Sequence, residues 1–342
     1  MHKRACRSEL DSHCGGCYIF TNPSGLGEIT RSNGGDSMKD SIIRVRDFRK
    51  VYGDVVAVDS ISFEVQRGEI FGLLGPNGAG KTSTLESLEG LRAPDGGSLQ
   101  VMGVDPARES RKLRNLIGVQ LQTSGLPDSM RVDEAMRFFC AYHGVAPHYH
   151  LLDRLGLTEK MGAQYHTLSA GLQRRLALAV AVAHNPPVMF LDEPTAGLDV
   201  SSRIELHNLM RELQTAGTTI ILATHDMAEA EKMADRVAIL LRGKIVATGT
   251  PRELTATGAG LTKVSVRTEG PSLSDPSITF PAVSQVAFKD DYAIYYSTDP
   301  GPTVSAIIVH IEAQGDTLID LRVERPSLEE RFLEITGTRG GQ

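Results

Sequence analysis

The chain has 342 residues, 41% of them apolar, which is enough for about two folded domains with buried cores. Its 36 basic and 42 acidic residues leave a formal net charge of −6, the wrong sign for a protein that binds the phosphate backbone of nucleic acid. The longest apolar run, 176–183, is less than half as long as the roughly 20 residues of a membrane-spanning helix, so we expect a cytoplasmic protein that does not cross a bilayer.

Residues 1–40 are rich in Ser, Gly, Asn and Asp and have no periodic apolar pattern, which predicts a disordered extension. Met38 is an alternative first residue, so a start site assigned too early is an equally good explanation of this segment. Cys14 and Cys17 have the spacing of half a zinc knuckle, but no second ligand pair follows, and we interpret them as incidental thiols.

The segment 41–250 has the pattern of an α/β domain. Apolar residues alternate along 42–48 and 56–65, as they do in half-buried antiparallel strands. The apolar run 69–74 leads into a glycine-rich loop and a helix over 81–91, which is the strand, loop and helix order of a nucleotide-binding fold. Further buried strands are predicted at 116–121, 188–191, 219–223 and 237–241.

A helical subdomain is predicted at about 130–184, inserted in the sheet domain, because Val132, Ala135, Met136 and Phe139 are spaced along one helix face. A Gly- and Thr-rich linker follows residue 249. A small α+β domain is then predicted over 262–342, with strands at 264–266, 283–288, 293–296 and 318–323 and a helix near 303–314. Its last helix begins at a capping box formed by Ser327 and Glu330.

The glycine-rich loop matches the pattern of a phosphate-binding loop, or P-loop. Its glycines let backbone N–H groups surround phosphate oxygens, and the following helix N-terminus adds partial positive charge. We expect Lys81 to contact the β- and γ-phosphates of ATP and Thr82 to ligate Mg²⁺. The predicted cofactor-binding residues here are Gly75, Pro76, Asn77, Gly78, Ala79, Gly80, Lys81, Thr82 and Ser83.

Two carboxylates, Asp192 and Glu193, follow the buried strand at 188–191. The carboxyl ends of strands are where open α/β sheets bind ligands, so Asp192 suits the metal and Glu193 an attacking water. The alternative is an acidic pair that merely caps a strand, and the nearby P-loop makes the catalytic interpretation the stronger one.

The run Leu168-Ser169-Ala170-Gly171-Leu172 resembles the signature motif of ABC ATPases and lies about twenty residues before the acidic pair. Tyr52 resembles the aromatic residue that stacks on adenine, Gln122 the Q-loop glutamine, 196–199 with Asp199 the D-loop, and His225 the switch histidine. Each residue has an ordinary alternative: a packed ring for Tyr52, a solvated amide for Gln122 and a helix-start residue for His225. Their joint occurrence in the family's order favours the functional interpretation.

The resemblance implies the P-loop ABC cassette fold, with a mixed sheet core, an antiparallel β subdomain and an inserted helical subdomain. It implies Mg²⁺ bound by Thr82, Asp192 and Gln122, with Glu193, His225 and Gln122 as catalytic residues. In the family, the signature residues, here Ser169 and Gly171, contact the γ-phosphate of the nucleotide on a second copy, so the active form is expected to be a head-to-tail dimer. Asp199 of the D-loop is counted among the nucleotide-binding residues. Ala170 and Leu172 depart from the usual Gly and Gln, which puts the fine geometry of the signature in question.

The resemblance also implies a separate transmembrane permease as partner, with this chain at the inner face of the cell membrane. Residues 325–337 resemble the ending of daunorubicin-resistance-type (ABC-2) exporter ATPases, which favours export, of the drug or antibiotic efflux type, over uptake. The sequence leaves the cargo open among drugs, antibiotics, lipids and polysaccharides. One alternative is a nonmembrane ABC ATPase acting on nucleic acid or the ribosome, but no sustained heptads and no second cassette occur. Another is a P-loop kinase or GTPase acting alone, against which the signature argues.

Overall fold

A computed structural model describes residues 41–121, 125–256 and 261–336. The expectations of a disordered extension over 1–40, of incidental thiols at Cys14 and Cys17, and of a catalytic and metal-binding Gln122 lie outside the described residues.

An antiparallel sheet of strand order β2-β1-β4 opens the described chain, and consists of β1 (Ser41–Tyr52), β2 (Val55–Gln66) and β4 (Gly96–Val101). The alternation predicted for the first two strands is present, since Ile43, Val45 and Phe48 are buried and pair with β2 residues. The sequence analysis missed β4, because its first residues, Gly-Gly-Ser, carry no apolar alternation.

The core sheet has the strand order β5-β6-β7-β3-β8-β9, in which neighbours from β5 to β8 run parallel and β9 is antiparallel. Residues of β3, β6 and β7 are buried throughout, as in a sheet covered on both faces. Their carboxyl ends meet at one edge, where the P-loop, the acidic pair and His225 follow. The bounds are β3 (Ile70–Leu74), β5 (Ile117–Gln120), β6 (Val188–Asp192), β7 (Thr219–Thr224), β8 (Arg236–Leu241) and β9 (Lys244–Gly249).

Helix α1 (Lys81–Leu88) ends three residues before the predicted end. The reason is Gly90, whose φ of 75° turns the chain and where a Cβ would lie 2.7 Å from the Pro106 carbonyl oxygen. Outside the inserted segment, the chain up to residue 256 also forms α2 (Ser110–Leu113), α6 (Val200–Thr215), α7 (Met227–Met233) and α8 (Pro251–Ala256).

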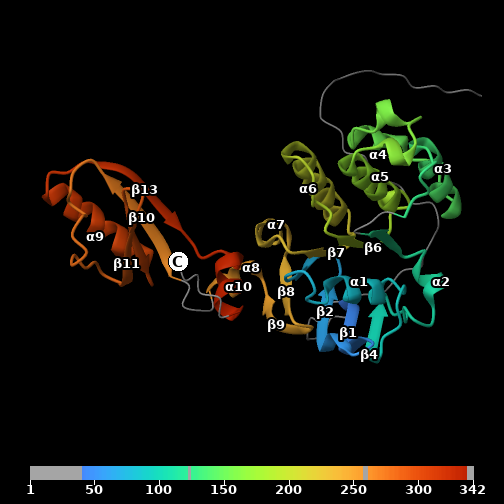
Figure 1. Ribbon diagram of the computed structural model, residues 1–342, viewed down its shortest axis with the longest axis horizontal. Helices are drawn as coiled ribbons and strands as arrows, with labels where there is room; N and C mark the ends of the chain where they lie inside the picture. Colours follow the sequence, from blue (N-terminus) through green and yellow to red (C-terminus); the bar gives the residue numbers. More distant parts are fainter. Residues whose placement is uncertain (1–40, 122–124, 257–260, 337–342) are drawn as a thin grey trace, which may run out of the picture. The chain divides into compact units, whose positions relative to one another are not determined.

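In the inserted segment, α5 (Ala170–Val182) packs against both α3 (Val132–Tyr142) and α4 (Tyr149–Arg154) (Figure 1). The buried face of α3 is the predicted one, except that Phe139 is only partly buried. Arg154 joins this group to α6, because its guanidinium nitrogens lie 2.7 Å from a Glu212 carboxylate oxygen and 3.2 Å from one of Glu205.

The C-terminal region contains a sheet of strand order β11-β12-β10-β13, with α9 (Pro300–Ala313) packed on β10 and β13 (Figure 1). Its strands are β10 (Thr262–Thr268), β11 (Val283–Lys289), β12 (Tyr292–Ser297) and β13 (Leu318–Glu324), each longer than predicted. The predicted capping box is confirmed: Ser327 N–H donates to Glu330 Oε2 at 3.1 Å, and Glu330 N–H to Ser327 Oγ at 3.2 Å. The domain limits 41–250 and 262–342 stay a prediction.

The last helix, α10 (Leu328–Thr336), packs on α7 and α8. Leu328 is fully buried in the cassette's main apolar core, and its N–H donates to Glu231 Oε2 at 3.1 Å. Phe332 and Ile335 join the cassette core, whereas Leu333 is 41% exposed.

Leu328→Ala should lower the free energy of unfolding by about 2–5 kcal/mol, because it opens a cavity in a core that the cassette shares with α10. Leu333→Ala on the same helix is the matched control and should change it by about 0.5 kcal/mol or less. The chain has no Trp, so urea unfolding is best followed by far-ultraviolet circular dichroism. Equal losses for the two variants would show that α10 is not part of the cassette core.

Candidate functional site

The P-loop connects β3 to α1, and its glycines are required by the close approach of neighbouring backbone. At Gly75, φ is 150° and a Cβ would lie 2.3 Å from the Leu240 carbonyl oxygen. At Gly80, φ is 107° and a Cβ would lie 2.6 Å from the Ala57 carbonyl oxygen. Ala79 is buried between them, while Pro76, Asn77 and Gly78 form the exposed tip. The loop therefore has the backbone freedom that a phosphate cradle needs.

Lys81, the first residue of α1, is buried and folds back over this loop. Its Nζ donates to the carbonyl oxygens of Gly75 at 2.8 Å and Pro76 at 3.3 Å, and lies 3.6 Å from Glu193 Oε1. Burial lowers the pKa of Lys81, and the neighbouring carboxylates oppose that shift. The ammonium group thus lies between the loop and the acidic strand end.

Asp192, the last residue of β6, faces the start of α1. Thr82 Oγ1 donates to Asp192 Oδ2 at 2.9 Å, whereas Asp192 Oδ1 is buried without a hydrogen-bond partner. Burial raises the pKa of this carboxyl, against the hydrogen bond from Thr82. A hydroxyl and a buried carboxylate oxygen with spare acceptor capacity fit one side of a magnesium ion, which usually keeps water and phosphate ligands as well. Ser83 follows, half-buried in α1.

Glu193 follows Asp192 with a φ of 50°, in the left-handed region. Pro194 disfavours the right-handed helical conformation for this residue, and a left-handed non-Gly residue costs on the order of 1–3 kcal/mol, so the surroundings must hold it. Its N–H donates to the Ala223 carbonyl at 2.9 Å. Its Oε2 lies 2.8 Å from Nδ1 of His225, which is the residue directly after β7. The structure therefore brings Glu193, His225 and Lys81 together.

Tyr52 ends β1, and its ring is 38% exposed. The Lys50 ammonium and the Arg92 guanidinium each lie 5.4 Å from its ring centroid. Lys50 Nζ forms an ion pair with Asp95 Oδ2 at 2.9 Å, and Arg92 forms one with Glu86 of α1. An exposed ring flanked by cations is a suitable platform for a nucleotide base.

The signature motif lies at the start of α5. Ser169 is the N-cap, and its Oγ accepts the Leu172 N–H at 3.3 Å. Ala170 is already helical and exposed, so its methyl group meets no strain, and Leu172 packs on the apolar core. Both departures from the usual motif are thus accommodated. Within the described ranges, no hydrogen bond connects Ser169 or Gly171 to the P-loop.

Asp199 caps α6 instead of contacting the P-loop. Its Oδ1 accepts from the Ser202 N–H at 3.0 Å and from Ser201 Oγ at 2.7 Å. Hydrogen bonds from Ser202, and to a smaller extent from Ser201, hold the pKa of this carboxyl well below its usual range.

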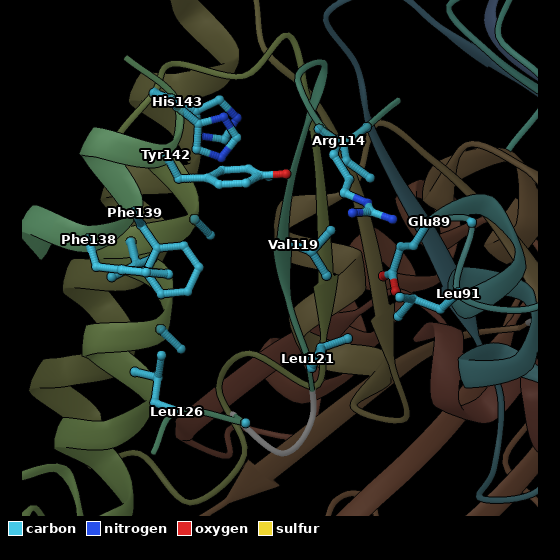
Figure 2. A pocket seen from close by; sticks show the side chains of 18 residues that line it. Glu89, Leu91, Arg114, Val119, Leu121, Leu126, Phe138, Phe139, Tyr142 and His143 are labelled. Atoms are coloured by element: carbon cyan, nitrogen blue, oxygen red, sulfur yellow. The ribbon is translucent and has the colours of Figure 1, made fainter. Parts of the chain in front are cut away.

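Sequence analysis missed an apolar groove of about 540 Å³ between β5 and α3 (Figure 2). Phe138 and Tyr142 on α3 are each 57% exposed, and Leu91 is 60% exposed. No periodic pattern signals such a groove, because its walls come from segments far apart in the chain. The lining also includes Glu89, Arg114, Val119, Leu121, Leu126, Phe139, His143 and His184.

Two polar features lie in this groove. Glu89 is 4% exposed, and its Oε2 has no hydrogen-bond partner. Burial, together with the charges of Asp192 and Glu86, raises the pKa of the Glu89 carboxyl to about 8. The rings of His143 and His184 stack at 3.7 Å, and burial lowers the pKa of His184 to about 4. At neutral pH the groove is thus mostly uncharged at these positions.

Comparisons with known proteins agree with this geometry. The family profile described as ABC transporter matches residues 58–196. The Nod factor export ATP-binding protein I of Ralstonia nicotianae is 36% identical over 305 residues, covering 86% of this chain and 94% of that protein. A solved ATP binding subunit of an ABC transporter has a TM-score of 0.59 at 27% identity, covering 63% of this chain and 92% of that one.

The dimeric post-hydrolysis structure of the cassette MJ0796 with ADP and Pi, at 22% identity and a TM-score of 0.57, covers 61% of this chain and 98% of its own and shows the fold alone. The sequence identity to the Ralstonia protein extends over most of both chains. The fold of this chain places the P-loop beside the acidic pair that ends β6. This chain therefore belongs to the family of ABC transporter ATP-binding subunits, ATPases whose hydrolysis of ATP is coupled to transport.

Proposed function

We propose that this chain powers an exporter, with Glu193 as the group that activates water for attack on ATP. The observation that carries the proposal is the cluster of Glu193, His225 and Lys81 where β6, β7 and β3 end together. Glu193 Oε2 accepts the proton of the attacking water, and His225 orients the carboxylate and contacts the γ-phosphate. Thr82 and Asp192 would hold Mg²⁺, whose charge would stabilise the transferring phosphoryl group.

ATP binding requires Lys81 to turn from the carbonyl oxygens of Gly75 and Pro76 toward phosphate oxygens, because an ammonium group has only three donors. The backbone N–H groups of the loop and of the start of α1 then surround the phosphates, and Tyr52 stacks on the base. Gln122 is proposed to complete the metal site.

The nucleotide site of one chain is proposed to be half of the working site. Ser169 is exposed at a helix N-terminus and makes no hydrogen bond to the P-loop within the described ranges. A second copy, arranged head to tail, would place Ser169, Gly171 and Asp199 against the γ-phosphate. Both sites of such a dimer then close on ATP together.

The apolar groove is proposed to receive the separate permease. Exposed aromatic side chains of α3 face Val119 and Leu121 of the β5 segment across it (Figure 2), which fits the apolar face of a helix. Glu89 lies at the end of α1, so an occupant of the groove contacts the helix that begins at the P-loop.

Export is supported by the name of the relatives, which are described as Nod factor export ATP-binding proteins. The name gives Nod factor as the exported molecule of those relatives, and not of this chain. A drug or antibiotic cargo for this chain remains a proposal that depends on the resemblance of residues 325–337. Within the described residues, no helix combines the length and apolarity of a membrane span, so the permease is proposed to be a different chain that holds this one at the inner membrane face.

Glu193→Gln should reduce ATP hydrolysis at least about 100-fold while ATP still binds, because the amide cannot accept the proton of water but keeps the shape of the side chain. Hydrolysis is measured as phosphate release, and binding by titration with a fluorescent ATP analogue. Glu64→Gln, at an exposed β2 position, is the control and should behave like the wild type. A Glu193→Gln protein with normal turnover would exclude Glu193 as the activating base.

Mixing two inactive variants tests the composite site. Ser169→Arg and Glu193→Gln should each be inactive alone, yet a mixed dimer has one intact site, formed by the P-loop and Glu193 of one chain and Ser169 of the other. Random pairing should restore about a quarter of wild-type ATPase activity, since half the dimers are mixed and each has one of two sites. Mixtures that stay inactive would mean that each chain completes its own site.

Phe138→Glu should release the chain from membranes prepared from the native organism, because a charge in the groove opposes an apolar partner. Val309→Glu, at an exposed apolar position of α9, is the matched control and should leave membrane association unchanged. Quantitative immunoblots of pelleted and supernatant fractions give the bound share, and phosphate release should be the same for both variants in the absence of membranes. Release by both variants, or by neither, would argue against this groove as the docking surface.

A further inference from the structure

The backbone of Glu193 is held in its unfavourable conformation by a side chain from the signature helix. Arg174 of α5 donates from one guanidinium nitrogen to the Glu193 carbonyl at 2.7 Å, and the same nitrogen also donates to the Ala196 carbonyl. The Glu193 carbonyl accepts a second hydrogen bond from the Ala196 N–H at 3.3 Å. One guanidinium therefore closes the turn of residues 193–196 from outside.

This turn connects the acidic strand end to the D-loop. Glu193 has a φ of 50°, and from this backbone conformation its carboxylate faces His225. The carbonyl that Arg174 bonds belongs to the peptide between Glu193 and Pro194. Hydrogen bonds from a charged donor are stronger than those between neutral groups, so Arg174 is well suited to fix that peptide. The direction of the Glu193 side chain is thus linked to Arg174 through the backbone of the turn.

The neighbouring polar side chains of α5 make contacts of another kind. Gln173 donates to the Tyr165 carbonyl at 3.0 Å, and Arg175 to the Leu155 carbonyl at 3.1 Å, both within the inserted helical segment. Arg174 instead reaches the core sheet. A Cβ on Gly171 would lie 3.5 Å from Leu198, so the start of α5 also lies against the D-loop.

We propose that Arg174 is a positioning residue for ATP hydrolysis, which holds the 193–196 turn and thereby links the direction of the Glu193 carboxylate to the position of the signature helix. Because α5 begins at Ser169, a displacement of this helix moves the Arg174 guanidinium relative to Glu193. The chain then places its base for attack only when the signature helix is in register with the turn. This inference depends on the proposed role of Glu193.

Arg174→Gln should lower kcat for ATP hydrolysis at least about tenfold and change KM for ATP less than about twofold, since the turn is loosened but the P-loop is untouched. Arg174→Lys, whose point charge replaces a planar fork, should recover part of kcat. Arg175→Gln is the matched control: it removes a neighbouring arginine that bonds only to Leu155 among the described contacts, and kcat should stay within about twofold of wild type.

Three outcomes overturn the proposal: wild-type kcat for Arg174→Gln, an equal loss of kcat for Arg175→Gln, or a loss of Arg174→Gln activity that appears in KM alone. If Arg174→Gln does not fold, Arg174→Lys decides, because the Lys side chain ends one bond short of the guanidinium nitrogen that bonds both carbonyls. A folded Lys variant with wild-type kcat then contradicts the positioning role. The Glu193→Gln result separates the two proposals. An inactive Glu193→Gln with a fully active Arg174→Gln removes only the role of Arg174, whereas an active Glu193→Gln removes the role of Glu193 itself.

Discussion

The order of three adjacent parallel strands, β6-β7-β3, is the constraint on which the rest of the structure depends. Pairing of Leu74 with Thr224 and of Asp192 with Ala223 brings three strand ends to the same level. The loops that leave this edge carry the P-loop, the acidic pair and His225. Because parallel strands buried on both faces allow little slippage, the distances between these groups are set by the core and not by the loops.

Charge balance at this edge explains why so many ionisable groups are tolerated inside the protein. Lys81, Asp192 and Glu193 are all buried, and a buried charge without a partner would be strongly unfavourable. The ammonium group of Lys81 offsets part of the two carboxylates, and Thr82 and His225 satisfy one oxygen of each. Asp192 Oδ1 stays without a partner, which is where the proposed metal ion belongs.

The inserted helices contact the catalytic edge and the groove on different sides. Arg174 reaches the turn after Glu193 from α5, while Phe138 and Tyr142 of α3 line the groove (Figure 2). Glu89 closes the other end of α1, the helix that starts at Lys81. A permease segment in the groove and a nucleotide at the P-loop would thus act on the same two elements, α1 and the helical insertion, which gives transport a physical connection to hydrolysis.

The P-loop and the acidic pair could be predicted from the sequence, because each is a short run whose residue types suit one kind of chemistry. The signature and His225 could be predicted only because they follow in an order that resembles that of the family. Local patterns also predicted the capping box at Ser327 and most strands, since these depend on neighbours in the chain. Only the tertiary structure showed that α10 belongs to the cassette core and that Arg174 holds the Glu193 backbone. The groove around Glu89 also became visible only in the tertiary structure, because its walls come from separate segments of the chain. These features join residues far apart in the chain, and the free energy that orders them comes from packing and buried hydrogen bonds that no local pattern contains.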